Sequence, residues 1–262
     1  MAIALGGLCV GLLAVPGSVV AEEVDVELAL MVDVSRSMAP YELSLQRRGY
    51  AEALVSDQVV NAILSSFTGK IALTYVEWAG DGSQRLIVPW TVIDGRESAE
   101  AVAAILREDS GFGMRRTSIS GAIKYGIEGI EGNAFKGLRR VIDISGDGPN
   151  NDGSPVERSR DRAIEAGIVI NGLPLMTWEP EEVWGIPDLN LYYEACVIGG
   201  PGAFVIPVHR WEDFPLAVRR KIVLELAGPP DVVLVAEHTR PKVDCMIGEK
   251  KRRERQRWFE LP

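Results

Sequence analysis

The chain has 262 residues, enough to bury a large core and to form one large domain with or without extensions. Apolar residues make up 47% of it and charged residues 25%, which excludes a largely disordered chain. The net charge of −9 argues against nucleic acid as the main partner, because phosphate binding needs a basic face.

Residues 1–20 carry no charged side chain, and the stretch ends in small and turn-forming residues up to Ala21. This pattern predicts a signal peptide, residues 1–21, cleaved after Ala21. The predicted signal peptide implies that the protein is periplasmic or secreted. Because the segment lacks Lys and Arg, an uncleaved membrane anchor and a misplaced start codon stay open, and membrane contact is expected only for the anchor.

From residue 22 to 227 strand-like and helix-like segments alternate, which predicts an α/β domain with a mostly parallel sheet. A glycine-rich turn at 80–83 predicts an antiparallel hairpin between two of the strands. Residues 173–202 fit neither period well and are interpreted as an insertion or loop region, and 228–262 as a C-terminal extension that leaves the core. The predicted strands are 24–32, 71–78, 86–93, 139–145, 168–172 and 203–207, and the predicted helices are 40–65, 97–106, 120–130, 155–166 and 211–226.

Two cysteines remain after removal of the predicted signal peptide, Cys196 and Cys245. An even pair in an oxidising compartment predicts a disulfide. Such a bond would close a loop of about 50 residues and contribute roughly 4 kcal/mol on the chain-entropy model. Two unrelated free thiols are the alternative.

A basic tail at 250–257 stands out on an otherwise acidic chain. A solvated terminal helix is the favoured interpretation, and contact with an acidic partner or a membrane is the alternative.

The segment Asp33-Val34-Ser35-Arg36-Ser37 follows the first predicted strand directly. Alternate residues of an extended chain point the same way, so the carboxylate and the two hydroxyls can converge. Hard oxygen ligands of this kind suit Mg²⁺. Two other oxygen-rich loops, 115–118 and 145–152, also lie where parallel sheets bind ligands, near the carboxyl ends of their strands.

On these residues the sequence is similar to the von Willebrand factor A (vWA) domain. That family has a metal-ion-dependent adhesion site (MIDAS) with Asp-x-Ser-x-Ser on one loop, Thr on a second and Asp on a third. The resemblance covers about residues 24–226 and implies a doubly wound, Rossmann-like sheet with one antiparallel edge strand and helices on both faces. The matching positions here are Asp33, Ser35, Ser37, Thr117 and Asp147.

Three segments, 75–78, 141–149 and 197–204, resemble an exported bacterial branch of this superfamily whose function is undefined. The chain departs from the family pattern at Gly146, where Thr is usual, and at Arg115 and Arg116, where small residues are usual.

The resemblance implies a divalent cation, Mg²⁺ with Mn²⁺ or Ca²⁺ as alternatives, because all three take oxygen ligands. It further implies a protein-binding, adhesion-type module in which the cation captures an acidic residue of a protein partner. Arg115, Arg116 and Ser118, which flank Thr117, are the candidate partner-binding residues.

Each predicted ligand also has a structural interpretation. Ser35 and Ser37 are residue types that cap helices, and Thr117 could cap the next helix while Ser118 served as ligand. Asp147 precedes a glycine, a combination that favours turns.

Two further functions stay open: a structural domain whose metal only stabilises the fold, and a Mg²⁺-dependent hydrolase using Asp33. We expect no enzyme. No G-x-S-x-G elbow, P-loop or dinucleotide fingerprint is present, and His209 and His238 have no recognisable catalytic partners. Residue 35 is Ser, so the paired carboxylates of an aspartyl-phosphate phosphatase are missing.

Two acidic residues, Asp143 and Glu77, lie in strands that should be buried. An ionised carboxylate in such a place is costly without a partner. The sequence does not identify the partners.

Overall fold

The computed structural model describes residues 21–108, 113–177, 185–227 and 243–260. Apart from Ala21, the predicted signal peptide lies outside these residues, as does His238. No helix in the described part of the chain is long and apolar enough to cross a membrane.

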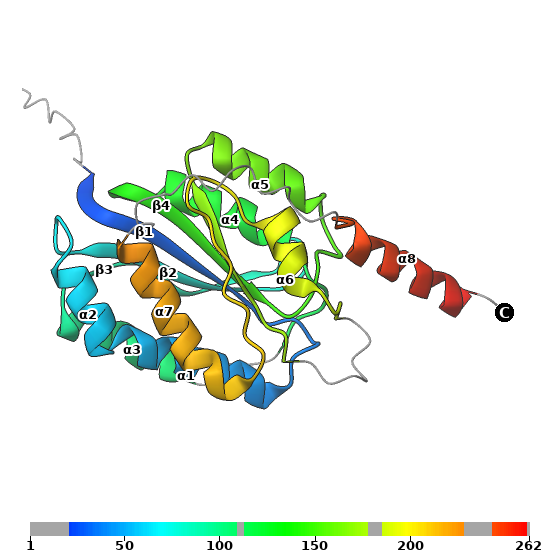
Figure 1. Cartoon of the computed structure of the whole chain (residues 1–262), viewed down its shortest axis with the longest axis horizontal. Helices are drawn as coiled ribbons and strands as arrows, with labels where there is room; N and C mark the ends of the chain where they lie inside the picture. The colour runs from blue at the N-terminus through cyan, green and yellow to red at the C-terminus, as the bar shows by residue number, and fades with distance from the viewer. Residues whose placement is uncertain (1–20, 109–112, 178–184, 228–242, 261–262) are drawn as a thin grey trace, which may run out of the picture.

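Five strands of the described chain form one sheet in the order β3-β2-β1-β4-β5 (Figure 1). Neighbouring strands are parallel except β2 and β3, which pair antiparallel at the edge, as the glycine-rich turn predicts. The strands are β1 (Glu22–Asp33), β2 (Ile71–Trp78), β3 (Gln84–Ile93), β4 (Phe135–Gly146) and β5 (Val169–Pro174).

The central strand β1 is buried on both faces, which explains its nearly continuous apolar sequence. Leu28 and Leu30 pack into the hydrophobic cluster on one side of the sheet, and Ala29 and Met31 pack into the cluster on the other. Each cluster is closed by helices, so the sheet is covered on both faces. The predicted doubly wound α/β class is therefore confirmed.

Helices α1, α2, α3 and α7 cover one face, and α4, α5 and α6 cover the other (Figure 1). Their bounds are α1 (Pro40–Leu54), α2 (Asp57–Leu64), α3 (Arg96–Arg107), α4 (Ile119–Glu131), α5 (Val156–Glu165), α6 (Leu189–Tyr192) and α7 (Phe214–Ala227). A turn of 3₁₀-helix (Trp211–Asp213) leads into α7, and a π-helical turn (Tyr193–Val197) follows α6.

Two predicted elements differ from the structure. The helix predicted over 40–65 is divided at Val55 and Ser56, because the Ser56 hydroxyl accepts a hydrogen bond from the Val59 N–H and caps a new helix. The strand predicted over 203–207 is not continuous. One isolated bridge, Gly172↔Val205, joins this segment to β5, and Pro207 has no N–H to donate to a ladder.

Both edges of the sheet are interrupted. On one side β3 carries the exposed Pro89 beside an irregularity in its pairing with β2. On the other side β5 is met by the isolated bridges Ile170↔Gly199, Gly172↔Val205 and Leu175↔Val208. Neither outer edge is a free, regular ladder.

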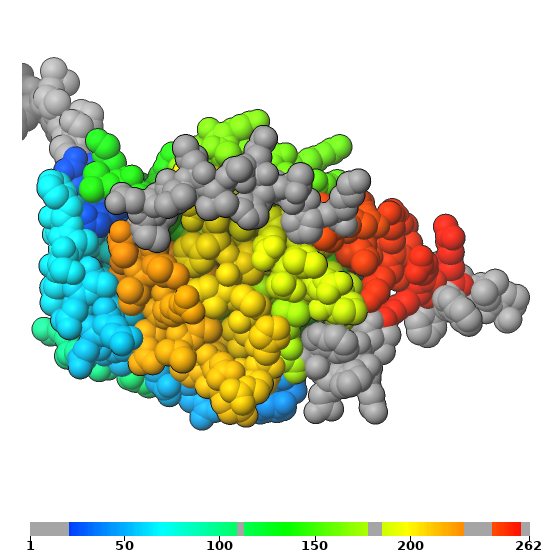
Figure 2. Space-filling model, viewed as in Figure 1, coloured from blue at the N-terminus to red at the C-terminus, as the bar shows by residue number. Residues whose placement is uncertain are grey.

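The C-terminal extension does not leave the core entirely. Val243, Cys245 and Ile247 pack against the cluster formed by α4, α5 and α6, and Cys245 is bonded to Cys196. The final helix, α8 (Ile247–Glu260), then projects from one side of the molecule (Figure 2, red). The predicted disulfide is thus present, and it explains why this segment returns to the domain.

Candidate metal centre

The first loop of the site begins where β1 ends. Asp33 is the last residue of the strand and is 0% exposed, and its Oδ1 accepts a hydrogen bond from the Ser35 N–H at 2.7 Å. The Ser35 and Ser37 hydroxyl oxygens lie 2.9 Å apart. From α1, the Gln46 side-chain amide donates to the Asp33 carbonyl at 2.9 Å, which fixes the end of the strand.

The second loop, 113–118, is held against the first by backbone hydrogen bonds. The Met114 N–H donates to the Val34 carbonyl at 2.8 Å, and Ser35 and Met114 form a parallel bridge. Arg116 has a φ of 72°, a left-handed conformation that is uncommon for a residue other than glycine. The turn brings Thr117, which is 5% exposed, beside the serines in the lining of one cavity.

The third loop, 147–152, begins directly after β4, the parallel neighbour of β1. The Asn151 N–H donates to the Thr117 carbonyl at 2.8 Å, and the Asn151 side-chain carbonyl accepts from the Thr117 N–H at 3.0 Å. These reciprocal bonds join the second and third loops. All five residues matched to the MIDAS pattern therefore belong to one connected group of loops.

Two carboxyl groups meet at the base of these loops. Burial raises the pKa of Asp33 well above its usual range, and the nearby Asp147 carboxylate raises it further. Burial also raises the pKa of Asp147, an effect that the Ser37 hydroxyl partly offsets by hydrogen bonding. Two neighbouring carboxylates in a poorly solvated site repel each other, which favours either a shared proton or a bound cation.

One oxygen of each carboxyl group is left unsatisfied. Asp33 Oδ2 and Asp147 Oδ1 are buried, and no donor of the described residues hydrogen-bonds to either of them. A Cβ placed on Gly146 would lie 3.0 Å from Asp33 Oδ2. The glycine at this position, where the family usually has Thr, therefore leaves room for the Asp33 carboxylate.

These donors fit a hard divalent cation. Two carboxylates and three hydroxyls are oxygen ligands of the kind that Mg²⁺, Mn²⁺ and Ca²⁺ prefer. Unsatisfied buried oxygens are the atoms that a cation would neutralise. Within the described ranges, no three or more His, Cys, Asp or Glu side chains are arranged so that they could hold a metal ion, so a nitrogen- or sulfur-rich zinc site is not found there.

The candidate partner-binding residues occupy different environments. Arg115 and Arg116 are exposed and line the cavity above the serines. Ser118 is fully buried and caps α4, where its hydroxyl accepts from the Gly121 N–H at 3.1 Å. Ser118 thus presents no exposed surface to a partner.

Several residues contribute to the site without having been predicted from the sequence. The Asp152 carboxylate forms ion pairs with Arg116 at 3.2 Å and with Arg252 at 2.6 Å. Glu42 accepts hydrogen bonds from the Ala39 N–H and from the Trp211 indole, and so fixes the end of the first loop. The basic tail was the only sequence signal for Arg252.

The buried acidic residues behind the site both have partners. Asp143 of β4 lies 2.9 Å from Lys221 Nζ of α7, and Lys221 also contacts Glu225 at 2.7 Å. Glu77 of β2 pairs with Arg47 at 2.6 Å and with Arg85. Each of these buried carboxyl groups therefore lies beside a cation supplied by another element of the fold.

Solved structures of low sequence identity share this fold. One similar chain is the pilus adhesin SpaC from Lactobacillus rhamnosus GG, with a TM-score of 0.56 and 11% identity over 78% of this chain and 31% of that chain. Another is proximal thread matrix protein 1 from the mussel byssus with a zinc-occupied MIDAS motif, with a TM-score of 0.54 and 14% identity over 79% of this chain and 49% of that chain. A von Willebrand factor type A protein from Catenulispora acidiphila is also similar, with a TM-score of 0.53 and 15% identity over 78% of this chain and 43% of that chain. The chain spans less than half the length of each of these proteins.

No curated protein sequence matches the chain. The fold is that of a vWA domain, as the resemblance in the sequence implies. A family model described as "Protein of unknown function (DUF1194)" matches residues 23–230, most of the chain and nearly all of the domain. The chain therefore belongs to the DUF1194 family.

Proposed function

We propose that this chain is an exported, divalent-metal-dependent protein-binding module of the adhesion type. Asp33, Ser35, Ser37, Thr117 and Asp147 would hold the cation, with Mg²⁺ first and Mn²⁺ or Ca²⁺ as alternatives. The cation supplies positive charge at the base of the cavity, where it attracts an acidic group of a protein partner. The observation that carries this proposal is the pair of buried, unsatisfied oxygens, Asp33 Oδ2 and Asp147 Oδ1.

The surroundings of Asp33 favour binding over hydrolysis. The residue is 0% exposed behind the two serines, and its Oδ1 is already engaged by the Ser35 N–H. A nucleophilic carboxylate needs an oxygen that a substrate can reach. The chain therefore acts, in this proposal, as a binding protein without enzymatic activity.

Export to the periplasm or the medium is part of the proposal. The disulfide between Cys196 and Cys245 supports an oxidising compartment, in which such bonds persist. Mass measurement of the mature protein tests this directly. We expect the mass of a chain that begins at Glu22. A soluble mature protein with Met1 intact would contradict the signal peptide.

The decisive experiment compares partner binding and stability in the same variants. Proteins retained from the envelope of the source cell are compared with Mg²⁺ and with EDTA, using the wild type, Asp33→Ala and Thr117→Val. Thr91→Val on the edge strand β3, away from the site, is the matched control. We expect the two site variants to lose the metal-dependent partners while their melting temperatures in EDTA stay close to that of the wild type.

The opposite pattern identifies the structural alternative. If partner binding persists in Asp33→Ala while Mg²⁺ no longer raises the melting temperature, the metal only stabilises the fold. Identical partner sets with Mg²⁺ and with EDTA would count against any metal-gated function.

A further inference from the structure

The last helix of the chain begins in direct contact with the third metal loop. A Cβ on Gly248 would lie 2.1 Å from the Asn150 carbonyl oxygen, closer than any side chain could fit. The Asn150 side-chain amide donates to Glu249 Oε1 at 2.7 Å. The first turn of α8 is therefore packed on the loop that follows Asp147.

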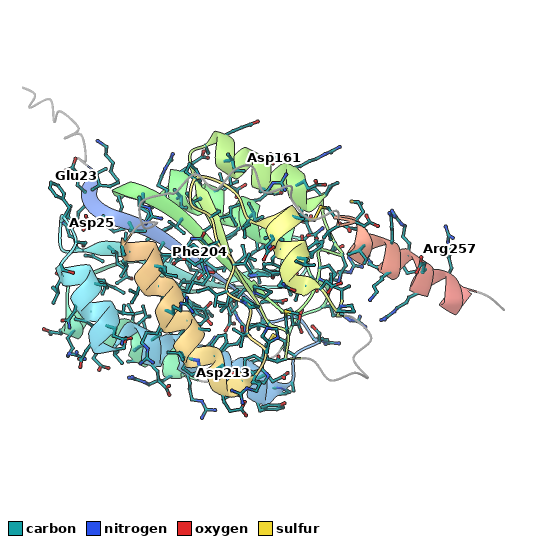
Figure 3. The ribbon with its side chains drawn as sticks, viewed as in Figure 1. Glu23, Asp25, Asp161, Phe204, Asp213 and Arg257 are labelled. Carbon is teal, nitrogen blue, oxygen red and sulfur yellow. A yellow bond between two sulfur atoms is a disulfide. The ribbon has the colours of Figure 1, made fainter. Side chains whose placement is uncertain are left out.

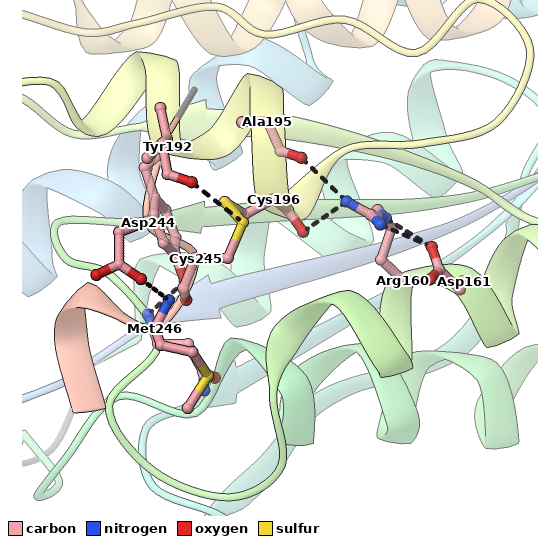
Figure 4. The surroundings of a disulfide bond; sticks show 10 residues. Arg160, Asp161, Tyr192, Ala195, Cys196, Asp244, Cys245 and Met246 are labelled. Atoms are coloured by element: carbon pink, nitrogen blue, oxygen red, sulfur yellow. Dashed lines mark hydrogen bonds and ion pairs between the residues drawn. A yellow bond between two sulfur atoms is a disulfide. The ribbon is translucent and has the colours of Figure 1, made fainter. Parts of the chain in front are cut away.

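A covalent bond holds this contact in place (Figure 4). Cys245, two residues before α8, is bonded to Cys196 in the π-helical turn. The Tyr192 hydroxyl donates to the Cys245 carbonyl at 3.4 Å, and Arg160 donates to the Cys196 carbonyl at 3.3 Å. The start of α8 is thus tied to the buried face of the domain on one side and to the metal loop on the other.

The next turn of α8 reaches the cavity itself. Arg252 donates to the Asn151 carbonyl at 2.8 Å and pairs with Asp152 at 2.6 Å. Asp152 also binds Arg116 of the second loop. Arg252, and Arg255 one turn later, line the cavity together with Ser35, Ser37 and Thr117.

The cavity has a charge opposite to that of the whole chain. Five arginines line it, Arg36, Arg115, Arg116, Arg252 and Arg255, against the two aspartates Asp81 and Asp152, whereas the chain carries a net charge of −9. Its volume is about 710 Å³, within the range of sites that hold drug-sized ligands. Such a volume exceeds that needed by one acidic side chain.

We propose that α8 forms part of the partner site, and that the partner is an acidic polypeptide segment with several neighbouring carboxylates. One carboxylate binds at the metal loops, and others pair with the arginines, of which Arg252 and Arg255 come from α8. Guanidinium groups suit this task because they bind carboxylates with two parallel hydrogen bonds. The proposal rests on the proposed metal-dependent function and names its ligand class.

A synthetic peptide tests the proposal with the full chain, disulfide intact. The probes are fluorescein-labelled hexa-aspartate and a serine peptide with a single aspartate, and binding is followed by fluorescence anisotropy in Mg²⁺. The test variant is Arg252→Gln/Arg255→Gln. The matched control is Arg253→Gln/Arg257→Gln, which removes the same charge from the same helix at exposed positions outside the cavity lining; Figure 3 shows Arg257 toward the far end of α8.

We expect the test variant to bind hexa-aspartate about tenfold more weakly than the wild type, since each partly exposed ion pair contributes a modest energy. The control variant should stay within about twofold of the wild type, and the single-aspartate peptide should not distinguish the two variants. Arg255→Gln alone keeps the contacts of Arg252 with the third loop and should show part of the loss.

Two results would overturn the role of α8: equal losses in the test and control variants, or no binding of hexa-aspartate to the wild type. Equally tight binding of a single-stranded oligonucleotide of the same charge would overturn the choice of an acidic polypeptide. The metal-dependent function is judged separately, because it fails when EDTA leaves wild-type binding of hexa-aspartate unchanged.

A variant that displaces α8 sterically provides an independent test of the role of this helix. Gly248→Ala should push the helix away from Asn150, weaken hexa-aspartate binding as Arg252→Gln/Arg255→Gln does, and speed hydrogen exchange in α8. Unchanged binding with faster exchange would show that the position of α8 is irrelevant to the site.

Discussion

Two buried carboxyl groups share one lysine where β4 packs against α7, and Arg139 of β4 interacts electrostatically with one of them, Glu225. Lys221 lies between Asp143 and Glu225, and all three are at most 1% exposed. The ring of Phe204, labelled in Figure 3, lies 5.0 Å from Lys221 Nζ. Burial lowers the pKa of Lys221, but the two carboxylates outweigh it and raise the pKa. The lysine therefore stays charged.

Burial raises the pKa of Asp143 to about 7 from 3.8, with Lys221 lowering and Glu225 raising it. Between these two values the folded protein keeps a proton that the unfolded chain has released, so the contribution of this group to stability falls as the pH rises. Asp143→Asn removes this titration. The free energy of unfolding of the variant should equal that of the wild type near pH 3.8 and exceed it toward neutral pH, by as much as about 4 kcal/mol.

Lys221→Met is the opposite perturbation, because it removes the one side chain that forms an ion pair with both buried carboxylates. Breaking a buried pair in this way costs about 3–5 kcal/mol. Urea denaturation followed by tryptophan fluorescence, repeated from acidic to neutral pH, gives the free energy of unfolding for both variants. The reasoning is refuted if Asp143→Asn is destabilised at neutral pH and its difference from the wild type does not change with pH.

Three further outcomes follow from the site and its support. Mg²⁺ at about a hundred times its dissociation constant should raise the free energy of unfolding by about 2.7 kcal/mol in urea denaturation, and equal midpoints with Mg²⁺ and EDTA would contradict this. Gly146→Ala should weaken Mg²⁺ binding in calorimetry, because its Cβ would lie 3.0 Å from Asp33 Oδ2; Gly95→Ala is the control, since nothing lies within 4 Å of a Cβ there. Replacing both Cys196 and Cys245 by Ser should lower the free energy of unfolding by roughly 4 kcal/mol, and a loss below about 1 kcal/mol would contradict the chain-entropy estimate.

The sequence predicted most of the sheet and its helices, because apolar periodicity reports burial directly. Its errors have local causes. The hydroxyl of Ser56 caps a second helix inside what one period describes as a single helix, and Pro207 interrupts a short apolar run. The three loops of the candidate site could be picked out because two of them directly follow strands, and the third, with Thr117, directly precedes a helix.

Contacts between distant segments were not predictable in the same way. Nothing near Asp143 in the sequence identifies Lys221 as its partner, and Arg47 is 30 residues from Glu77. The position of α8 depends on a glycine that fits against Asn150 and on a disulfide, neither of which has a periodic pattern. Cys196 and Cys245 could be paired by counting, but their pairing alone did not place the basic helix at the metal loops.

The two interrupted edges of the sheet restrict how any partner can bind. Proteins that recognise extended peptides often add the peptide as another strand, which needs an open ladder of backbone donors and acceptors. Here Pro89 interrupts one edge, and the bridges to Gly199, Val205 and Val208 occupy the other. The same features protect the folded chain against edge-to-edge aggregation. We therefore expect the proposed partner to contact side chains and loops, so that selectivity could change through a few loop residues while the sheet stays the same.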